Sequence, residues 1–268
     1  MSEVVLFGHP VSHSLSPAMH NAAFKALGLP HRYVTRDVEE ARLGAEVARL
    51  RTDDVLGANV TIPHKEASLR LVDELSPETR AIGALNTIVR RGSVLLGANT
   101  DAYGFEAALD AAGAPLAGVA VLVLGAGGAA RACVHALLQR RSDVLVANRS
   151  SERLDALVRS LEVGGRRPRP AAWPRAGETI GADAVVNTTP LGMRGEDPLD
   201  GVGLPGVVVD IVPTAETTAL VKRARATENV TVVEGLSMLL HQAARSFELW
   251  TGAPAPLEVM RSALPRRA

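Results

Sequence analysis

The chain has 268 residues, 47% of them hydrophobic, and its 29 basic and 29 acidic residues cancel, which argues against a nucleic-acid or polyanion-binding surface. That length supplies two modest cores, because domains usually run about 100–200 residues. No stretch approaches about twenty uninterrupted apolar residues, the amino terminus lacks a signal-peptide pattern and the single Cys133 has no disulfide partner in the chain, so we expect a soluble cytoplasmic protein.

The first predicted elements are a strand over 4–7, a serine-containing loop, and a helix from Pro17 to about Leu27. Ser16 directly precedes Pro17, as an N-cap residue often does, so a capping role competes with a ligand role. Ser14 has no such structural reason and is placed to hydrogen-bond a polar ligand at the end of the strand. A second strand over 32–35 and a helix over 40–50 follow.

The segment from Val55 to Lys65 is predicted to be a strand that stops at Pro63 and turns into a helix. Lys65 would then lie in the first helical turn, where the helix dipole opposes a cation and lowers the affinity of an ammonium for its proton. Such a lysine suits acid–base catalysis. The alternative is a lysine that simply reaches solvent.

Two strands, over 84–90 and 94–98, are expected to form a hairpin around the turn at 91–93. Asn86 lies in the first strand, where a buried amide without partners costs about 1–3 kcal/mol. Asp101 follows the second strand, just before a helix that begins near Tyr103. It is either an N-cap or a functional carboxylate.

The stretch from Val119 to Arg153 has the pattern of a dinucleotide-binding unit. A strand over 119–124 is followed by Gly125 for the tight turn, Gly127 for close approach of a pyrophosphate, and Ala130 for close packing of helix on strand. The helix that follows directs its N-terminal amides toward phosphate. Cys133 lies within this helix and is expected to pack as a small apolar side chain.

The end of the next strand, over 144–147, distinguishes between the two nicotinamide dinucleotides. An NAD site has an acid there, whereas this chain has Asn148 and Arg149, with Arg153 one helical turn further on. A guanidinium grips a phosphate with two hydrogen bonds, so we predict NADP. The alternative is that these arginines are merely solvated at the start of a surface helix.

The remaining chain continues the alternation, with strands over 184–187, 206–212 and 230–233 and helices over 153–161 and 217–226. Such alternation predicts a parallel sheet with helices on both faces. An amphipathic helix over 235–249, which carries Gln242, and a shorter helix after Pro256 end the chain. The scattered histidines offer no convincing ligand set, so no metal is expected.

Eight motifs occur in one order along the chain: His13-Ser-Leu-Ser-Pro17, Asn59-Val-Thr-Ile-Pro-His-Lys65, Gly83-Ala-Leu-Asn-Thr87, Asn99-Thr-Asp101, the Gly125 turn, Asn148-Arg-Ser-Ser-Glu-Arg153, Asn187-Thr-Thr-Pro-Leu-Gly192 and Gly235-Leu-Ser-Met-Leu-Leu-His-Gln242. In these motifs the chain resembles the shikimate dehydrogenase family over nearly its full length.

The resemblance implies an α/β fold with two domains. Residues 1–101 would form a substrate domain with a mixed sheet, completed by the C-terminal helices over 236–268. Residues 102–235 would form a Rossmann-type NADP-binding domain, with the active site in the cleft between the two. The implied reaction is reversible hydride transfer between NADPH and 3-dehydroshikimate, giving shikimate and NADP, in the route to chorismate and the aromatic amino acids. Whether the chain is a monomer or a homodimer stays open.

The resemblance also implies roles for particular residues. Lys65 would exchange the proton that the oxygen needs as hydride reaches the carbon, and Asp101 would orient the ammonium. The residues expected to bind the substrate are Ser14, Ser16, Asn59, Thr61, Lys65, Asn86, Asp101 and Gln242. Those expected to bind the cofactor are Gly125, Ala126, Gly127, Gly128, Ala129, Asn148, Arg149, Arg153, Thr188, Ile211 and Gly235.

One segment departs from the family pattern. A tyrosine, with a proline two residues later, usually follows the strand that here ends at Val212, but this chain has Pro213 and Ala215. A phenolic hydroxyl that lies near nicotinamide and substrate in the family is therefore missing. A quinate/shikimate or aminoshikimate dehydrogenase is the rival reading, although Arg149 argues against the NAD typical of quinate activity. A non-catalytic metabolite sensor on the same fold is the other alternative.

Overall fold

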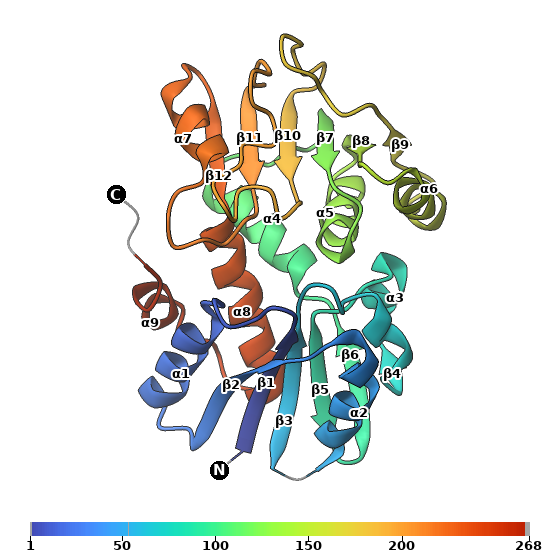
Figure 1. Cartoon of the computed structure of the whole chain (residues 1–268). Helices are drawn as coiled ribbons and strands as arrows, with labels where there is room; N and C mark the ends of the chain where they lie inside the picture. Colours follow the sequence, from blue (N-terminus) through green and yellow to red (C-terminus); the bar gives the residue numbers. More distant parts are fainter. Residues whose placement is uncertain (1, 53, 266–268) are drawn as a thin grey trace. The chain divides into compact units, whose positions relative to one another are not determined.

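The computed structural model describes residues 2–52 and 54–265, and these fall into two compact units (Figure 1). The first unit contains the chain up to Gly104 together with Leu240–Pro265. The second unit is Phe105–Leu239. Two long helices, α4 (Asp101–Ala111) and α8 (Gly235–Thr251), each contribute residues to both units.

The first unit is built on a mixed sheet, as predicted. Within the described residues it has six strands in the order β2-β1-β3-β5-β6-β4. Strand β5 runs antiparallel to both of its neighbours, and the other pairs are parallel. The strands are β1 (Ser2–Gly8), β2 (His31–Asp37), β3 (Val55–Val60), β4 (Glu74–Leu75), β5 (Thr87–Arg91) and β6 (Val94–Ala98).

Several short helices surround this sheet. The helix predicted over 40–50 is in fact α2 (Leu43–Ala48) between two 3-10 turns, η1 (Glu40–Arg42) and η2 (Arg49–Arg51). The short elements β4 and α3 (Pro77–Ile82) were not predicted from the sequence. The other helical elements are α1 (Ser16–Ala26), η3 (Ala67–Arg70), the end of α8, and α9 (Leu257–Ser262), which packs against α1.

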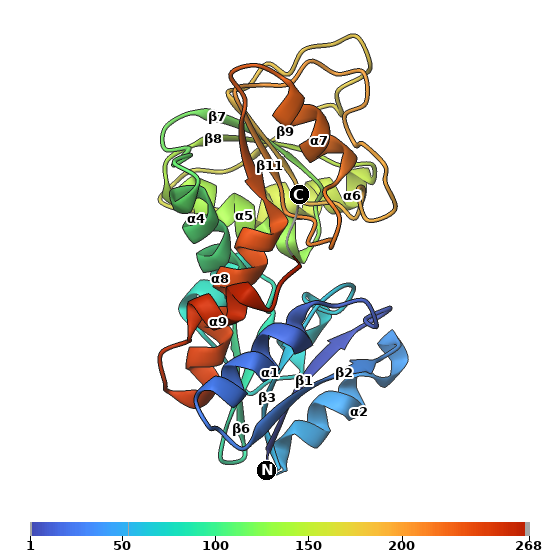
Figure 2. The ribbon, with the colours of Figure 1, turned by 90° about the vertical axis from the view of Figure 1, so that its left-hand side faces the viewer.

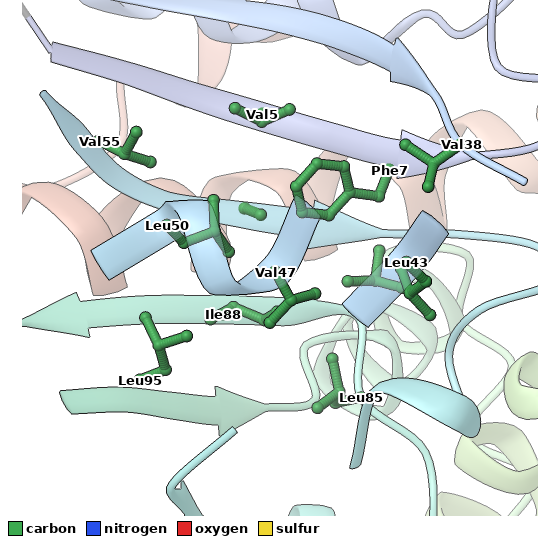
Figure 3. Close-up of a cluster of buried hydrophobic side chains, with 12 residues drawn as sticks. Val5, Phe7, Val38, Leu43, Val47, Leu50, Val55, Leu85, Ile88 and Leu95 are labelled. Atoms are coloured by element: carbon green, nitrogen blue, oxygen red, sulfur yellow. The ribbon is translucent and has the colours of Figure 1, made fainter. Parts of the chain in front are cut away.

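Each face of the first sheet has its own core. On one face, Leu43, Val47 and Leu50 from the α2 region cover Phe7 and Ile88 of the sheet (Figure 3). Because side chains alternate along a strand, neighbouring strand residues point to the opposite face. Helices α1 and α8 pack there, as the rotated view also shows (Figure 2).

An aromatic cluster fills this second face. The ring of His20 on α1 stacks on Tyr33 of β2 with centroids 4.4 Å apart, and Phe247 and Trp250 of α8 lie beside it. The imidazole of His20 is wholly buried, and burial lowers its pKa to about 3. Neither ring nitrogen has a hydrogen-bond partner among the described residues.

Helix α8 crosses the sheet very closely at Gly57. The indole Nε1 of Trp250 donates a hydrogen bond of 2.9 Å to the backbone oxygen of Ile88. A Cβ on Gly57 would lie 2.1 Å from that oxygen and 2.7 Å from the indole nitrogen. Only glycine leaves room for this contact, which fixes the C-terminal helix on the first unit.

The second unit has the predicted doubly wound parallel sheet. Its strands, six in the described part of the chain, pair in the order β12-β11-β10-β7-β8-β9, all parallel. They are β7 (Ala120–Leu124), β8 (Asp143–Ala147), β9 (Arg169–Pro170), β10 (Ala184–Asn187), β11 (Val207–Asp210) and β12 (Thr231–Glu234). The strand order reverses at β7, and such reversals are where parallel sheets bind ligands.

Helices α5 (Gly128–Gln139), α6 (Ser151–Ser160) and α7 (Ala219–Ala226) connect these strands. Cys133 on α5 is buried as a free thiol, as the sequence suggested. The short strand β9 lies between α6 and β10, in a stretch where no strand was predicted. No helix among residues 2–52 and 54–265 is long and apolar enough to cross a membrane.

Candidate active site

A nearly buried ion pair in the first unit joins Lys65 to Asp101. The ammonium Nζ lies 2.5 Å from Oδ2 of the carboxylate, and the two side chains are only 13% and 5% exposed. Lys65 follows β3, and Asp101 is the first residue of α4. A charged pair that is largely removed from water keeps its hydrogen bond in one geometry, so the ammonium of Lys65 is held in a defined orientation.

The prediction that Lys65 lies in the first turn of an α-helix is wrong. Residues 65 and 66 form a turn, and the helical piece that follows, η3, is a short 3-10 helix that begins at Ala67. The backbone oxygen of Lys65 accepts a hydrogen bond from the Leu85 amide, which ties the turn to the segment before β5. The carboxylate of Asp101, and not a helix dipole, is therefore the electrostatic partner of this lysine.

The alternative that Asp101 is only an N-cap is also wrong. Asn99 has that role, because its Oδ1 accepts hydrogen bonds from the backbone amides of Asp101 and Ala102 at 3.0 and 3.2 Å. The sequence reasoning missed Asn99, although asparagine is a strong N-cap former. With the cap supplied by Asn99, the carboxylate of Asp101 is directed at Lys65.

Asn86 links this ion pair to α8. It is buried one residue before β5, so the prediction that it lies within a strand over 84–90 is wrong at this position. Its Nδ2 lies 2.9 Å from Oδ1 of Asp101, 2.9 Å from the hydroxyl of Thr100 and 3.1 Å from Oε1 of Gln242. The structure thus brings together Lys65, Asn86, Asp101 and Gln242, which are far apart in sequence.

Asn59 on β3 lies behind Asn86. Its Oδ1 accepts a hydrogen bond of 2.8 Å from the hydroxyl of Tyr33, and its Nδ2 donates to the backbone oxygen of Asn86 and to Ser246. Burial raises the pKa of the Tyr33 hydroxyl, so that it stays protonated and donates. Tyr33 and Ser246 were not predicted, although Ser246 lies one helical turn after Gln242 on the same face of α8.

The serine loop and Thr61 lie around the same strand ends. Ser16 is the first residue of α1, and the N-cap is Leu15, which makes no side-chain capping bond, so the N-cap alternative for Ser16 is wrong. The hydroxyl of Ser14 accepts a hydrogen bond from the Ser16 amide at 3.2 Å. Thr61, which follows β3, packs against the end of β1: a Cβ on Gly8 would lie 2.4 Å from the methyl group of Thr61.

In the second unit, the glycine turn after β7 has the geometry that its sequence predicts. Gly125 has φ +110°, and a Cβ there would lie 2.6 Å from the hydroxyl of Thr188, which donates to the backbone oxygen of Leu124. Gly127 is the N-cap residue of α5. Ala126 precedes it, and Gly128 and Ala129 form the start of the helix, whose free amides attract an anion.

The two arginines lie at the adjoining strand end. Asn148 donates to the backbone oxygen of Ser150, and Ser150 in turn caps α6 by accepting from the Arg153 amide. Both Arg149 and Arg153 are exposed, and a Cβ on Gly127 would lie 3.8 Å from Nη2 of Arg153. The guanidinium of Arg153 therefore lies beside the glycine turn, where a bound phosphate would contact both the guanidinium and the backbone amides of the turn.

Ile211 and Gly235 lie together at the ends of β11 and β12. A Cβ on Gly235 would come within 2.5 Å of the carbonyl carbon of Ile211, so glycine permits α8 to start against that backbone. Pro213, which stands where the family usually has tyrosine, is exposed in the loop between β11 and α7. No group of three or more metal-binding side chains is found in the part of the chain that the structure describes.

Comparison with known proteins agrees with this geometry. Three family models match the chain: "Shikimate dehydrogenase substrate binding domain" over residues 6–88, "Shikimate / quinate 5-dehydrogenase" over 106–168 and "Shikimate 5'-dehydrogenase C-terminal domain" over 235–264. A shikimate dehydrogenase (NADP(+)) from Symbiobacterium thermophilum is 43% identical, over 96% of this chain and 92% of its own length. The chain belongs to the shikimate dehydrogenase family.

Other members of the shikimate dehydrogenase family give the same result. The enzyme of that name from Rubrobacter xylanophilus is 44% identical, over 98% of this chain and 95% of its own. The crystal structure of shikimate 5-dehydrogenase from Thermus thermophilus in complex with NADP(H) and shikimate superposes with a TM-score of 0.83. It is 37% identical and covers 98% of both chains. The predicted family and fold class are thereby confirmed.

Proposed function

We propose that the protein is an NADP-dependent shikimate dehydrogenase, which reversibly reduces 3-dehydroshikimate to shikimate in the biosynthesis of aromatic amino acids. The observation that carries the proposal is the buried Lys65–Asp101 pair, held by Asn86 at 2.9 Å from the second carboxylate oxygen. It occurs in a chain that is 43% identical to a shikimate dehydrogenase (NADP(+)) over nearly its whole length.

Reduction of the ketone needs a proton at the carbonyl oxygen. NADPH, when bound, supplies the hydride to the carbonyl carbon. Lys65 gives its proton to the carbonyl oxygen as negative charge develops there, and takes it back in the reverse direction. Asp101 holds the ammonium in one orientation and hydrogen-bonds the reacting hydroxyl.

The rest of the first-unit site binds the substrate's carboxylate and ring hydroxyls. Its members are hydroxyl and amide side chains that match such a polyhydroxylated acid, namely Ser14, Ser16, Thr61, Asn86 and Gln242. Asn59, whose amide is hydrogen-bonded to Tyr33 and to the Asn86 backbone, completes the proposed substrate-binding set.

NADP is held by the second unit. The turn from Gly125 to Ala129 takes the pyrophosphate on backbone amides, and Arg149 and Arg153 take the 2′-phosphate of the adenosine. Asn148, Thr188, Ile211 and Gly235 complete the surface around the dinucleotide. The position of Arg153 beside Gly127 supports this assignment, because it places positive charge next to the phosphate-binding turn.

Steady-state kinetics with shikimate, quinate and an amino analogue, each with NADP and with NAD, test the proposal. We expect the highest kcat/KM for shikimate with NADP. A preference for quinate with NAD, or for the amino analogue, would replace the substrate, and binding without any turnover would make the protein a sensor. A cytoplasmic location is part of the proposal and agrees with a buried free thiol at Cys133.

A further inference from the structure

Three buried hydroxyls lie behind the Lys65–Asp101 pair: those of Thr87, Thr100 and Ser246, each no more than 1% exposed. They come from β5, from the turn before α4, and from α8. Hydroxyl groups both donate and accept, so they do not by themselves orient the amides of Asn59 and Asn86 that they contact. Backbone groups do so instead.

Two backbone contacts fix which end of each amide is the donor. The Asn86 backbone oxygen can only accept, so the group of Asn59 that lies 2.9 Å from it is Nδ2. The Thr100 amide can only donate, so the group of Asn86 that lies 2.7 Å from it is Oδ1. These assignments turn Nδ2 of Asn86 toward Oδ1 of Asp101.

The hydroxyl of Thr87 lies between the two amides. It accepts from Nδ2 of Asn59 at 3.1 Å, so its single proton is available for Oδ1 of Asn86, also at 3.1 Å. Ser246 lies 2.8 Å away on its other side. Thr87 is thus the one residue of the described chain whose hydroxyl bonds both amides at once.

We propose that Thr87 is a positioning residue for proton transfer: its hydroxyl, bonded to both amides, holds the side chain of Asn86 in place, so that the N–H end set by the Thr100 amide stays on Asp101 and Asp101 stays on Lys65. The inference rests on the proposed function. A methyl group in place of this hydroxyl has to move away from three polar atoms that now lie at 2.8–3.1 Å, because a methyl carbon packs against non-bonded atoms at about 3.5 Å or more. The two amides would then shift, and the carboxylate with them.

Two substitutions separate this role from simple packing. Thr87→Val keeps the shape and removes the hydroxyl, whereas Thr87→Ser keeps the hydroxyl and removes the methyl group. If the hydroxyl positions Asn86, Thr87→Val lowers kcat with shikimate by about 10- to 100-fold and leaves the KM for NADP unchanged, and Thr87→Ser recovers most of the loss. If Thr87 only fills space in a β-strand, the order reverses, because serine leaves a cavity.

Thr79→Val is the matched control. Thr79 on α3 is equally buried and its hydroxyl bonds Ser76 at 2.7 Å, but no contact of this hydroxyl with the site is present in the described structure. We expect its loss to lower Tm without changing kcat. A Thr87→Val protein with wild-type kcat, or a Thr87→Ser protein as impaired as Thr87→Val, overturns the proposal.

A crystal structure of Thr87→Val gives a readout that does not depend on the substrate. We expect the distances from Asp101 to Asn86 and to Lys65 to lengthen from 2.9 and 2.5 Å beyond hydrogen-bonding range for at least one pair. Unchanged distances would refute the positioning role. If the wild type fails to oxidise shikimate while the distances change, the proposed function fails and the positioning role stands.

Discussion

Lys65 and Asp101 are nearly buried, and both carboxylate oxygens of Asp101 accept hydrogen bonds. Arg149 and Arg153, in contrast, are exposed, in the unit that contains the glycine turn. The first arrangement is assembled from residues up to 187 positions apart, such as Asn59 and Ser246. The second comes from one continuous stretch of strand, turn and helix.

The two sites achieve selectivity in different ways. A buried, fully hydrogen-bonded network is already organised for one ligand geometry, and a single unpaired group in it is costly. Exposed guanidiniums act by charge on a flexible stem and are weakened by salt. Substitutions in the first unit should therefore reduce turnover, and those in the second should reduce cofactor affinity.

Lys65→Ala should have the largest effect. Removing the proton donor is expected to lower kcat by about 10³-fold, within the usual range for general acid–base catalysis, while the affinity for NADP stays unchanged. Steady-state kinetics measure kcat, and titration with NADP followed by fluorescence measures the affinity for NADP. Lys25→Ala, at an exposed position on α1, is the control and should behave as wild type. Turnover that survives in Lys65→Ala would show that another group moves the proton.

The double change Arg149→Ala and Arg153→Ala should come next. Loss of two guanidiniums from a phosphate is expected to raise the KM for NADP by about 100-fold, with little change for NAD, which lacks the 2′-phosphate. In the wild type, the difference between the KM for NADP and the KM for NAD should become smaller at high salt. Arg159→Ala on the same helix, where Arg159 pairs with Asp155, is the control. An unchanged NADP to NAD ratio would mean that these arginines are only solvated.

His20→Leu tests the buried core behind the substrate site. The folded protein holds this imidazole neutral with a pKa of about 3, whereas the unfolded chain takes up a proton below about pH 6.5. The contribution of this neutral imidazole to the unfolding free energy is therefore fully present above about pH 6.5, and it is lost as the pH falls from there toward 3. Between pH 7 and 5 the wild type should lose about 2 kcal/mol more unfolding free energy than His20→Leu.

Urea unfolding at the two pH values measures this difference. Equal losses in the two proteins would show that His20 becomes protonated without unfolding. Leucine has no polar atoms, so it leaves nothing unpaired among the rings of Tyr33 and Phe247.

The two glycines of the nucleotide turn should give the smallest and most selective effect. At Gly127 an added Cβ meets only the end of Arg153 at 3.8 Å, so Gly127→Ala should fold normally and raise the KM for NADP by about tenfold, because the methyl group meets the pyrophosphate. At Gly125 the φ of +110° and the contact with Thr188 make alanine strained, so Gly125→Ala should lower Tm as well. If both variants melt alike, the two glycines share one structural role.

Much of the fold was predictable because its signals are local. The strand, glycine turn and helix around Gly125 follow from residue sizes and apolar runs over about thirty residues, and the structure has each of them. The hairpin of β5 and β6 was predictable from its turn at Gly92. The helix over 40–50 was predicted too simply, because the sequence pattern does not reveal where a helix tightens into 3-10 turns.

Four of the side chains predicted for the substrate site lie together in the structure, namely Lys65, Asn86, Asp101 and Gln242, but the sequence did not give all of the contacts that hold them. Motifs such as Asn99-Thr-Asp101 indicated which residues to examine, but not that Asn99 caps α4 and so releases Asp101 to pair with Lys65. The helix dipole assigned to Lys65 was wrong, because the chain turns at residue 65 to bond the segment before β5. Such a contact depends on sheet register, which no local pattern specifies.

Short stretches of sequence were enough to infer the family, the two alternating α/β patterns and the arginines that favour a phosphorylated cofactor, because each of these depends on residues that are close together in the chain. The packed structure was needed to show that Lys65 lies outside a helical turn, that Nδ2 of Asn59 is directed toward Oδ1 of Asn86, and that the Thr87 hydroxyl lies between these two atoms. These side chains come from β3, β5, α4 and α8 and meet only when the sheet and the C-terminal helix are packed. Their hydrogen bonds depend on distances set by that packing, and a linear pattern carries no information on such distances.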